Sequence, residues 1–433
     1  MPRILLTTVC REPAFYDYFR ENAPRGYKWR FGMPRQISFG LRFLRQNLPE
    51  LEILEYPSHA NFTKILSEGW DAVGFSFYLD ETNTILEMAE EVRHAGVPEL
   101  WAGNYGALTP AIQSSFDQVF VGYGEDAVAQ RLGKTIDYIE HPPLVVRFKL
   151  PGGWILPVGV LFTTRGCSFT CTFCQTTAFA PRPKAIPLAS LERAIKFYAE
   201  HGIQFVLILD ENFGNIPAQA EAAIDLLARY GLHWFVQSRV DLFLRNFNEW
   251  QRLGMEGALF GIESFHQDVL KQIHKNEKVE AIHELTSRLN SEGLYAQGYY
   301  IIGFPGETPE SIREDLHTLA GLNLDTTQIT IVTPHPRTQL WSELDTTYGI
   351  FEKDWSRYNT KNLVWRHPHC RPGSLESLLE EGFRLCYGRN WLARTMKKFL
   401  TRRRSQRDLL GVALGPLHAR LATPHRLPYF AAA

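Results

Sequence analysis

The feature of this sequence that most constrains its fold is the regular alternation of short β-rich runs with amphipathic helical stretches. Strands separated by helices have to be joined by crossover connections, which favours a parallel, doubly wound sheet with ligands at the carboxyl ends of its strands. We therefore predict an α/β domain over residues 1–140. Its strands are expected at residues 3–10, 51–57, 71–77, 99–105 and 118–124.

A second series of βα units follows an interruption that is rich in proline and glycine, residues 141–157, which we predict to be a linker. Parallel strands with helices between them predict an incomplete (β/α)6 barrel over residues 158–345, with its site on the loops after the strands. Residues 346–433 are expected to form a small, mainly helical C-terminal region. The barrel strands are predicted at 160–164, 204–210, 233–239, 257–263, 295–303 and 327–333.

Composition excludes several classes of protein. The 46 basic and 47 acidic residues nearly cancel, so the charge of the whole chain attracts neither nucleic acid nor an anionic membrane. No apolar run reaches the roughly 18 residues of a membrane span, and the N-terminal apolar run is too short for a signal peptide. We predict a cytoplasmic protein. Six cysteines in such a chain form no disulfide framework, so a tight group of them indicates metal or redox chemistry.

Three cysteines, Cys167, Cys171 and Cys174, lie in the stretch GCSFTCTFCQ directly after the first predicted barrel strand. Thiolates with the spacing C-x3-C-x2-C can bind three corners of a cubane iron–sulfur cluster and leave the fourth iron without a protein ligand. A structural zinc site would need a fourth ligand, and His201 lies beyond a predicted helix. Zinc or simple buried thiols stay open as alternatives.

This spacing, with the aromatic Phe173 before the last cysteine, resembles that of the radical S-adenosylmethionine (SAM) enzymes. The resemblance implies a [4Fe–4S] cluster on Cys167, Cys171 and Cys174 whose open iron is chelated by SAM. It also implies cleavage of SAM to a 5′-deoxyadenosyl radical that removes a substrate hydrogen. An external electron donor such as flavodoxin or ferredoxin would then be a partner.

Four further motifs are similar to the branch of this family that has an N-terminal cobalamin-binding domain. They are DENF, QSRVD, GIES and GFPGET, beginning at residues 210, 237, 261 and 303. By resemblance, Arg239 pairs with the carboxylate of SAM and Glu263 binds its ribose or amino group. The backbone of Gly303, Pro305 and Gly306 would contact the adenosine. The alternative for each motif is a polar residue or a turn that ends a strand.

The resemblance extends to the N-terminal region through WAGNYGALTP and FDQVFVGYGED, beginning at residues 101 and 116. It implies that cobalamin is bound there, although tight turns explain the glycines equally well. No D-x-H-x-x-G segment is present, so we expect no histidine ligand on cobalt, and the lone His59 is expected to face solvent. The implied cobalamin contacts are Gly74, Ser76, Gly103, Gly122 and Glu125.

A second departure from that branch is Arg337 in TPHPRT, where the branch usually has glycine.

The leading hypothesis is an enzyme that uses the adenosyl radical and methylcobalamin to methylate an unactivated carbon of a small molecule or lipid. The alternatives are a radical cyclase or oxidoreductase without methyl transfer, and a cobalamin or redox sensor without catalysis. Methylthiolation is disfavoured, because the N-terminal region holds only Cys10.

The C-terminal region contains an amphipathic basic helix, predicted over residues 391–410, with Lys397, Lys398 and Arg402 to Arg404 on it. Such a helix either contacts an anionic membrane peripherally or packs its apolar side on the barrel. Cys370 and Cys386 are expected to be buried thiols. The aromatic residues Trp355, Tyr358 and Trp365 are expected to pack in the core or to form an apolar lid.

Overall fold

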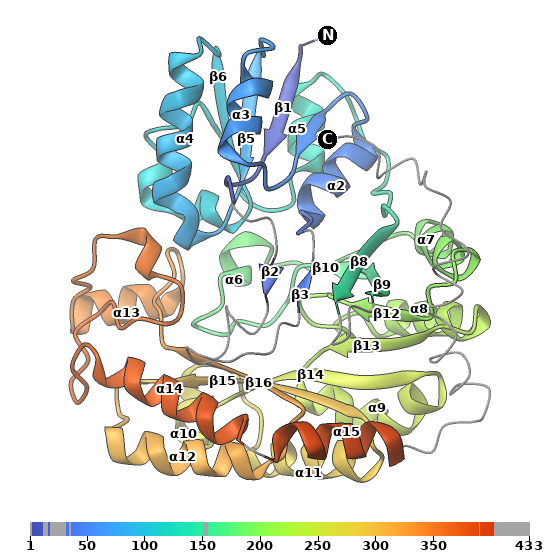
Figure 1. Cartoon of the computed structure of the whole chain (residues 1–433), viewed down its shortest axis with the longest axis vertical. Coiled ribbons are helices and arrows are strands. Elements are labelled where there is room, and N and C mark those ends of the chain that lie inside the picture. The colour runs from blue at the N-terminus through green and yellow to red at the C-terminus, as the bar shows by residue number, and fades with distance from the viewer. Residues whose placement is uncertain are drawn as a thin grey trace.

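The computed structural model describes residues 2–11, 16–17, 32–33, 36–149, 155–388 and 390–401. Two sheets dominate it, and Figure 1 shows the smaller one in the upper part of the molecule and the larger one below. Helices cover both sheets, and the C-terminal helices lie along the lower part. This arrangement confirms the predicted α/β fold class.

The smaller sheet has the parallel strand order β4-β1-β5-β6-β7. Alternate residues of its first strand belong to two separate cores: Leu5 packs in one and Ile4 and Leu6 pack in the other. Both faces are therefore covered, as a doubly wound sheet requires. Its strands are β1 (Ile4–Thr7), β4 (Glu52–Leu54), β5 (Ala72–Ser76), β6 (Glu99–Gly103) and β7 (Gln118–Val119). Its helices are α2 (Phe39–Asn47), α3 (His59–Leu66), α4 (Thr82–His94) and α5 (Glu125–Arg131).

The larger sheet contains the parallel series β9-β12-β13-β14-β15-β16, and among the described strands β16 forms one free edge. The sheet curls without closing, so the predicted incomplete barrel is confirmed. The strands of this parallel series are β9 (Ile155–Leu161), β12 (Phe205–Ile208), β13 (His233–Gln237), β14 (Met255–Glu263), β15 (Tyr295–Ile302) and β16 (Thr326–Ile331). The intervening helices are α7 (Leu188–Glu200), α8 (Pro217–Arg229), α9 (Val240–Arg252), α10 (Gln267–Gln272), α11 (Val279–Ser291) and α12 (Pro309–Gly321).

The described residues of the stretch that we predict to be a linker, 141–149 and 155–157, include strands. This stretch contains β8 (Leu144–Lys149), which pairs antiparallel with β9 and extends the larger sheet. The reason is local: Leu144, Val145 and Val146 are buried, and the hydroxyl of Tyr198 accepts from the amide of Leu144 and donates to the carbonyl of Val160. A β-branched apolar run beside an exposed strand edge pairs with it.

The C-terminal region packs on the barrel. Its helices are α13 (Gln339–Thr347), α14 (Ser374–Cys386) and α15 (Trp391–Thr401), and α14 lies against α12 and β16. Cys370 and Cys386 are buried thiols, as predicted. Trp365 and Tyr358 are buried in the main core, which favours the core-packing alternative over an apolar lid.

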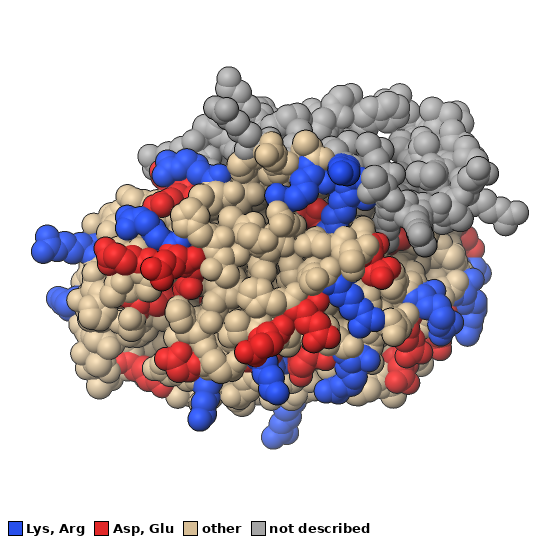
Figure 2. Space-filling model, turned by 90° about the horizontal axis from the view of Figure 1, so that it is seen from below, with Lys and Arg blue, Asp and Glu red and all other residues tan. Residues whose placement is uncertain are grey.

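Helix α15 is held against the barrel by polar contacts. The indole of Trp391 donates to the Asp325 carbonyl at 2.7 Å, and Lys398 lies 2.6 Å from the Asp325 carboxylate. Lys398 therefore turns into the protein, whereas Arg402 to Arg404 lie outside the described residues. Figure 2 shows basic and acidic side chains interspersed over the face seen from below. These observations support packing of the described part of α15 on the barrel.

None of the described helices combines the length and the apolar character that crossing a bilayer requires.

A buried ion pair joins helix α5, beside the smaller sheet, to the segment that follows β9 of the larger sheet. Arg165, in the short strand β10 (Thr164–Arg165), places its guanidinium 2.7 Å from the carboxylate of Glu125 on α5. The same guanidinium lies 3.7 Å from the ring centre of Phe43 and 4.5 Å from that of Tyr123. Glu125, which we expected to contact cobalamin, is thus occupied at the junction. An acidic residue in the first turn of a helix suits this place, because the helix dipole also favours it.

We predict that Glu125→Gln lowers the free energy of unfolding by about 3–5 kcal/mol, because it leaves Arg165 buried without its counter-charge. The matched control is Glu99→Gln, whose partner Arg131 is 44% exposed and whose loss should cost at most about 1 kcal/mol. Urea unfolding followed by circular dichroism measures both. The double variant Glu125→Leu, Arg165→Met should recover much of the loss; equal effects of the two single variants would contradict a junction held by this pair.

Candidate active site

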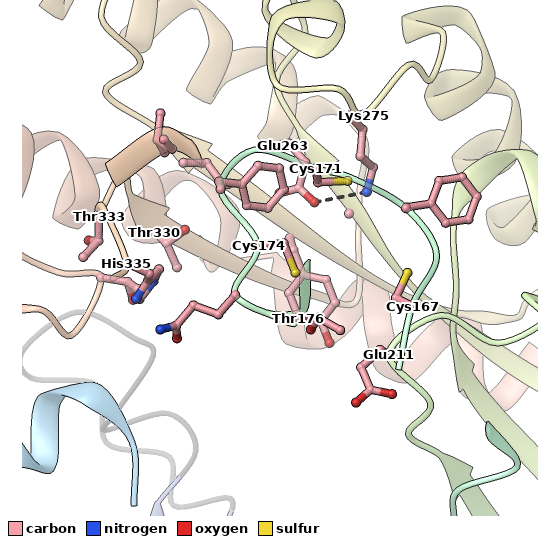
Figure 3. Close-up of a pocket in the computed structure, with 18 of the residues that line it drawn as sticks. Cys167, Cys171, Cys174, Thr176, Glu211, Glu263, Lys275, Thr330, Thr333 and His335 are labelled. Atoms are coloured by element: carbon pink, nitrogen blue, oxygen red, sulfur yellow. Dashed lines mark hydrogen bonds and ion pairs between the residues drawn. The ribbon is translucent and has the colours of Figure 1, made fainter. Parts of the chain in front are cut away.

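A cavity of about 510 Å³ lies where the carboxyl ends of both sheets meet. The cysteine loop and the ends of β12 to β16 form most of its wall. Tyr78 and Tyr105, which follow β5 and β6, close it from the side of the smaller sheet. Figure 3 shows the three predicted cluster cysteines on one loop at this cavity. The topology therefore brings together residues that are far apart in the sequence.

Backbone hydrogen bonds fix the cysteine loop. The amide of Cys167 donates to the Ala180 carbonyl at 3.1 Å, and the amide of Thr172 donates to the Ile273 carbonyl at 3.1 Å. Gly166 has φ +89°, and a Cβ there would lie 2.6 Å from the Ala180 carbonyl oxygen, so this turn requires glycine. Cys167, Cys171, Cys174 and Phe173 all line the cavity.

The thiols themselves are half-buried, and none is in a disulfide. Burial raises the pKa of Cys167, and it raises the pKa of Cys171 to about 11, with Cys174 adding to both shifts. The thiols of Cys167 and Cys171 would stay protonated at neutral pH unless a metal replaced the proton.

The cysteines suit a cluster better than a single ion. In the described part of the chain, no three His, Cys, Asp or Glu side chains converge as ligands of one metal ion. A structural zinc ion needs four ligands that meet at one point, whereas a cubane cluster takes one thiolate at each of its separate irons. Three soft donors spread around one cavity wall therefore fit a cluster with an open iron.

Glu263 reaches the cavity through an unusual backbone. It ends β14 with φ +61°, next to a register shift between Gly261 and Glu263. A Cβ on Gly261 would collide with the Glu263 carboxylate and lie 2.6 Å from the Lys275 ammonium, so glycine leaves room for this pair. Strain of this kind concentrates at functional sites.

Lys275 is a site residue that the sequence patterns did not reveal. It lies in the loop after α10, 3.2 Å from Glu263 and 3.5 Å from Glu277. Burial lowers the pKa of Lys275, but the carboxylates of Glu263 and Glu277 outweigh it and hold that pKa above its usual value. Burial also raises the pKa of Glu263, while Lys275 opposes that shift. The cavity therefore contains a buried ammonium between two carboxylates.

Arg239 lies beside this pair at the N-terminus of α9. Its Nε contacts the Asp241 carboxylate at 3.1 Å, and one terminal nitrogen donates to the Lys275 carbonyl at 2.7 Å. The guanidinium stacks 4.2 Å over Phe169. These contacts orient Arg239 along the cavity wall, where we predict it to pair with the carboxylate of SAM.

The GFPGET turn is only partly at the cavity. Phe304 lines it, whereas Gly303, Pro305 and Gly306, the predicted contacts, are not among the lining residues. Gly303 has φ +86° and faces Leu375, and its amide donates to the buried Glu307 carboxylate at 2.6 Å. The Glu307 carboxylate therefore fixes the turn through the Gly303 amide. Burial raises the pKa of Glu307 to about 7.

The predicted cobalamin contacts separate into two groups. Gly74 lies within β5, where a Cβ would meet Leu6 at 2.6 Å, and Gly122 has φ +95° and faces the Phe179 carbonyl. Strand packing and the domain junction account for these two, so the structure does not place them at a cofactor site. Ser76 and Gly103 end their strands opposite each other, at the edge that faces the cavity.

Other residues also differ from, or add to, the sequence-based expectations. The side chain of His59 is 62% exposed, as expected, and it pairs with Glu91 at 2.9 Å. Arg337 adopts φ +64°, so the turn that usually has glycine is kept by an arginine. Tyr105 stacks on Phe179 with ring centres 4.2 Å apart, and its hydroxyl contacts that of Thr176 at 3.0 Å. An isolated aromatic residue after a strand gives no sequence signal of such a role.

Residues 161–319, which carry the cysteine loop and most of the cavity wall, match the family described as the radical SAM superfamily. This segment is a radical SAM domain. The family uses the cluster and SAM that the cysteine loop predicts, so the radical SAM domain explains the lining residues from Cys167 to Phe304.

Two curated relatives are methyltransferases. An uncharacterized methyltransferase of Pyrococcus horikoshii is 30% identical over 239 residues, which are 53% of this chain and 51% of that protein. The bacteriochlorophyllide d C-8(2)-methyltransferase of Chlorobaculum tepidum is 24% identical over 341 residues, 70% of this chain and 74% of that protein. The chain thus spans about half the length of the first relative. Other relatives include cyclases as well as methyltransferases.

A solved structure extends the likeness beyond the radical SAM domain. The radical SAM methyltransferase TsrM of Kitasatospora setae, with cobalamin and a [4Fe–4S] cluster bound, has a TM-score of 0.60 at 17% identity. The likeness covers 80% of this chain and 78% of that one. At this identity it shows a shared fold, over a larger part of this chain than the radical SAM domain covers.

We predict that Gly261→Ala weakens SAM binding at least about tenfold, a loss of about 1.4 kcal/mol, because the new methyl group displaces Glu263 and Lys275. Calorimetric titration of SAM into cluster-loaded protein measures this. The control is Gly321→Ala at the end of α12, where nothing lies within 4 Å of a Cβ. Wild-type affinity in a folded Gly261→Ala variant would show that the pair does not contact SAM.

Proposed function

We propose that the protein is a cobalamin-dependent radical SAM C-methyltransferase that acts on an unactivated carbon of a small-molecule or lipid substrate. The observation that carries this proposal is the single cavity shared by the three-cysteine loop and the carboxyl edge of the smaller sheet. A methyl carrier and a radical source must both reach the same substrate carbon, and this cavity gives both of them access. The methyltransferase relatives support the proposal.

Cys167, Cys171 and Cys174 would hold the cluster, which supplies the electron that cleaves SAM when it is bound. Arg239 and the Glu263–Lys275 pair lie beside that loop and would orient SAM through its carboxylate and its ribose or amino group. Ion pairs of both Arg239 and Lys275 with Glu277, and of Lys275 with Glu263, fix these side chains before a ligand arrives, which reduces the entropy cost of binding. An external one-electron donor such as flavodoxin or ferredoxin is part of the proposal.

Cobalamin would lie at the edge formed by Ser76 and Gly103, where Tyr78 and Tyr105 of the following loops line the cavity, and would supply the methyl group for transfer. Gly103 leaves open space, because the nearest atom to a Cβ there is the Phe75 carbonyl oxygen at 3.9 Å. The only described histidine that lines the cavity, His335, follows β16 and belongs to the larger sheet. This supports cobalamin binding without a histidine ligand.

A radical cyclase is the second candidate, because cyclases are among the relatives. The two outcomes separate by product: methylation adds one methyl group to the substrate, whereas cyclisation or oxidation removes hydrogen. A sensor without catalysis would form no 5′-deoxyadenosine. Electrostatics at the cavity favour an enzyme, because a sensor has no use for a buried SAM-binding charge network.

We predict that the triple variant Cys167→Ala, Cys171→Ala, Cys174→Ala loses the cluster iron and its visible absorption after anaerobic reconstitution, and forms no 5′-deoxyadenosine. The variant Cys370→Ala, Cys386→Ala should keep both, because these thiols are buried in the C-terminal region. Iron analysis and chromatography of the nucleoside product measure the two effects. A triple variant with wild-type iron content would place the cluster elsewhere.

We predict that Gly103→Leu abolishes uptake of hydroxocobalamin and leaves the iron content unchanged, because a leucine side chain would fill the open space at the strand end. Gly40→Leu on α2 is the control, since Gly40 is exposed and a Cβ there meets nothing within 4 Å. Absorption spectra after gel filtration measure retained cobalamin. Equal retention by wild type and Gly103→Leu would remove cobalamin from this edge.

A further inference from the structure

The charged and the uncharged parts of the cavity wall are separate. The charged lining residues in the described chain are Glu211, Arg239, Glu263 and Lys275. Figure 3 shows Glu211, Glu263 and Lys275 beside the cysteines, whereas Thr330, Thr333 and His335 lie together on another part of the wall. The region around His335 therefore offers polar but uncharged groups.

Two residues that line this cavity, His335 and Gln175, each have a buried side-chain nitrogen, Nδ1 and Nε2 respectively, that lacks a hydrogen-bond partner within the described protein. Asn212 Nδ2 is a third such atom, but Asn212 lies next to Arg239, whose amide donates to its side chain. A buried polar atom without a partner is costly, so native proteins keep such atoms mainly where a ligand or an ordered water completes them.

The backbone presents His335 rigidly. Its carbonyl accepts from the amide of Thr338 at 3.2 Å and from the Thr338 hydroxyl at 2.7 Å. That hydroxyl also accepts from the amide of Trp341 at 3.1 Å and so caps α13. The turn that carries His335 is thus tied to the start of a helix, which fixes the backbone of His335 relative to the cavity.

Resting on the proposed function, we propose that His335 and Gln175 bind an uncharged polar group of the substrate, a hydroxyl or a carboxamide, and thereby select the substrate. A neutral imidazole has one N–H donor and one acceptor nitrogen, and the Gln175 amide nitrogen donates. A hydroxyl or carboxamide both donates and accepts, so it can satisfy both side chains. A carboxylate or phosphate only accepts, and it would lie here without a counter-charge.

The charge state of the imidazole agrees with this assignment. Burial lowers the pKa of His335 to about 4, and no charged neighbour contributes to that shift. Because the folded-state pKa lies below the ordinary value, the ring is neutral throughout the physiological range. A neutral ring cannot act as the cation for an anionic substrate group.

The first test uses a matched pair of probes, benzamide and benzoate, and needs no catalysis. Nuclear magnetic resonance of cluster-loaded protein with labelled histidine gives the ring resonance of His335, which is assigned by its loss in His335→Gln. This resonance should shift saturably with benzamide and not with benzoate. It should also show no titration between pH 6 and 8. The exposed His317 on α12 is the internal control. No shift with benzamide, an equal shift with benzoate, or titration in that range would overturn the proposal.

In the second test, wild-type enzyme is incubated with metabolite fractions and with SAM that carries a deuterated methyl group. The product that gains the labelled methyl group identifies the substrate. His335→Phe should raise KM for that substrate at least about tenfold, and His335→Gln should restore most of it. Unchanged KM in His335→Phe would overturn the proposal. If wild type forms 5′-deoxyadenosine but no methylated product, the proposed function fails, and the probe experiment still decides the role of His335.

Discussion

Parallel strands joined by helical crossovers present all their carboxyl ends at one edge, and in this protein two such edges face each other. The smaller sheet contributes the ends of β5 and β6, and the larger one contributes the ends of β9 to β16. The cavity exists because these edges are held together, and the buried contact between Arg165 and Glu125 lies at that junction. A rotation of one sheet relative to the other would uncouple a cofactor at Ser76 and Gly103 from the cysteine loop.

In the cavity, the cost of burying a charged side chain is offset by a neighbouring side chain of opposite charge. Lys275 is an ammonium far from bulk water, and it is stable there because Glu263 and Glu277 lie within 3.5 Å. Glu277 also accepts from the amide of Val240 at the start of α9, which ties the network to the helix that carries Arg239. Buried charges of both signs can therefore be ready for the charged ends of SAM without ligand-induced rearrangement.

Sequence patterns predicted the fold class and the cysteine loop well, because both depend on local spacing. At Gly74 and Gly122 the same patterns do not separate packing from binding, since a glycine needed for strand packing or a turn looks in the sequence like one needed for a ligand, and cobalamin contact at these two positions stays a prediction. They missed Lys275 and Tyr105, whose roles arise from contacts between distant segments: Lys275 meets Glu263 only after α10 folds back, and Tyr105 meets Phe179 only across the junction. Hydrophobic periodicity carries no information about such pairs.

Arg337 shows how a departure from a pattern can be absorbed. A residue with a side chain in the left-handed region costs about 1–2 kcal/mol, so an arginine at φ +64° persists only if its surroundings fix the turn. Thr338 fixes it from one side by capping α13 and bonding to the His335 carbonyl, and β16 fixes it from the other. Because the turn is kept, His335 keeps its place at the cavity, while the exposed Arg337 side chain lies outside it. The arginine therefore changes the surface beside the cavity and not the shape of the wall that meets the substrate.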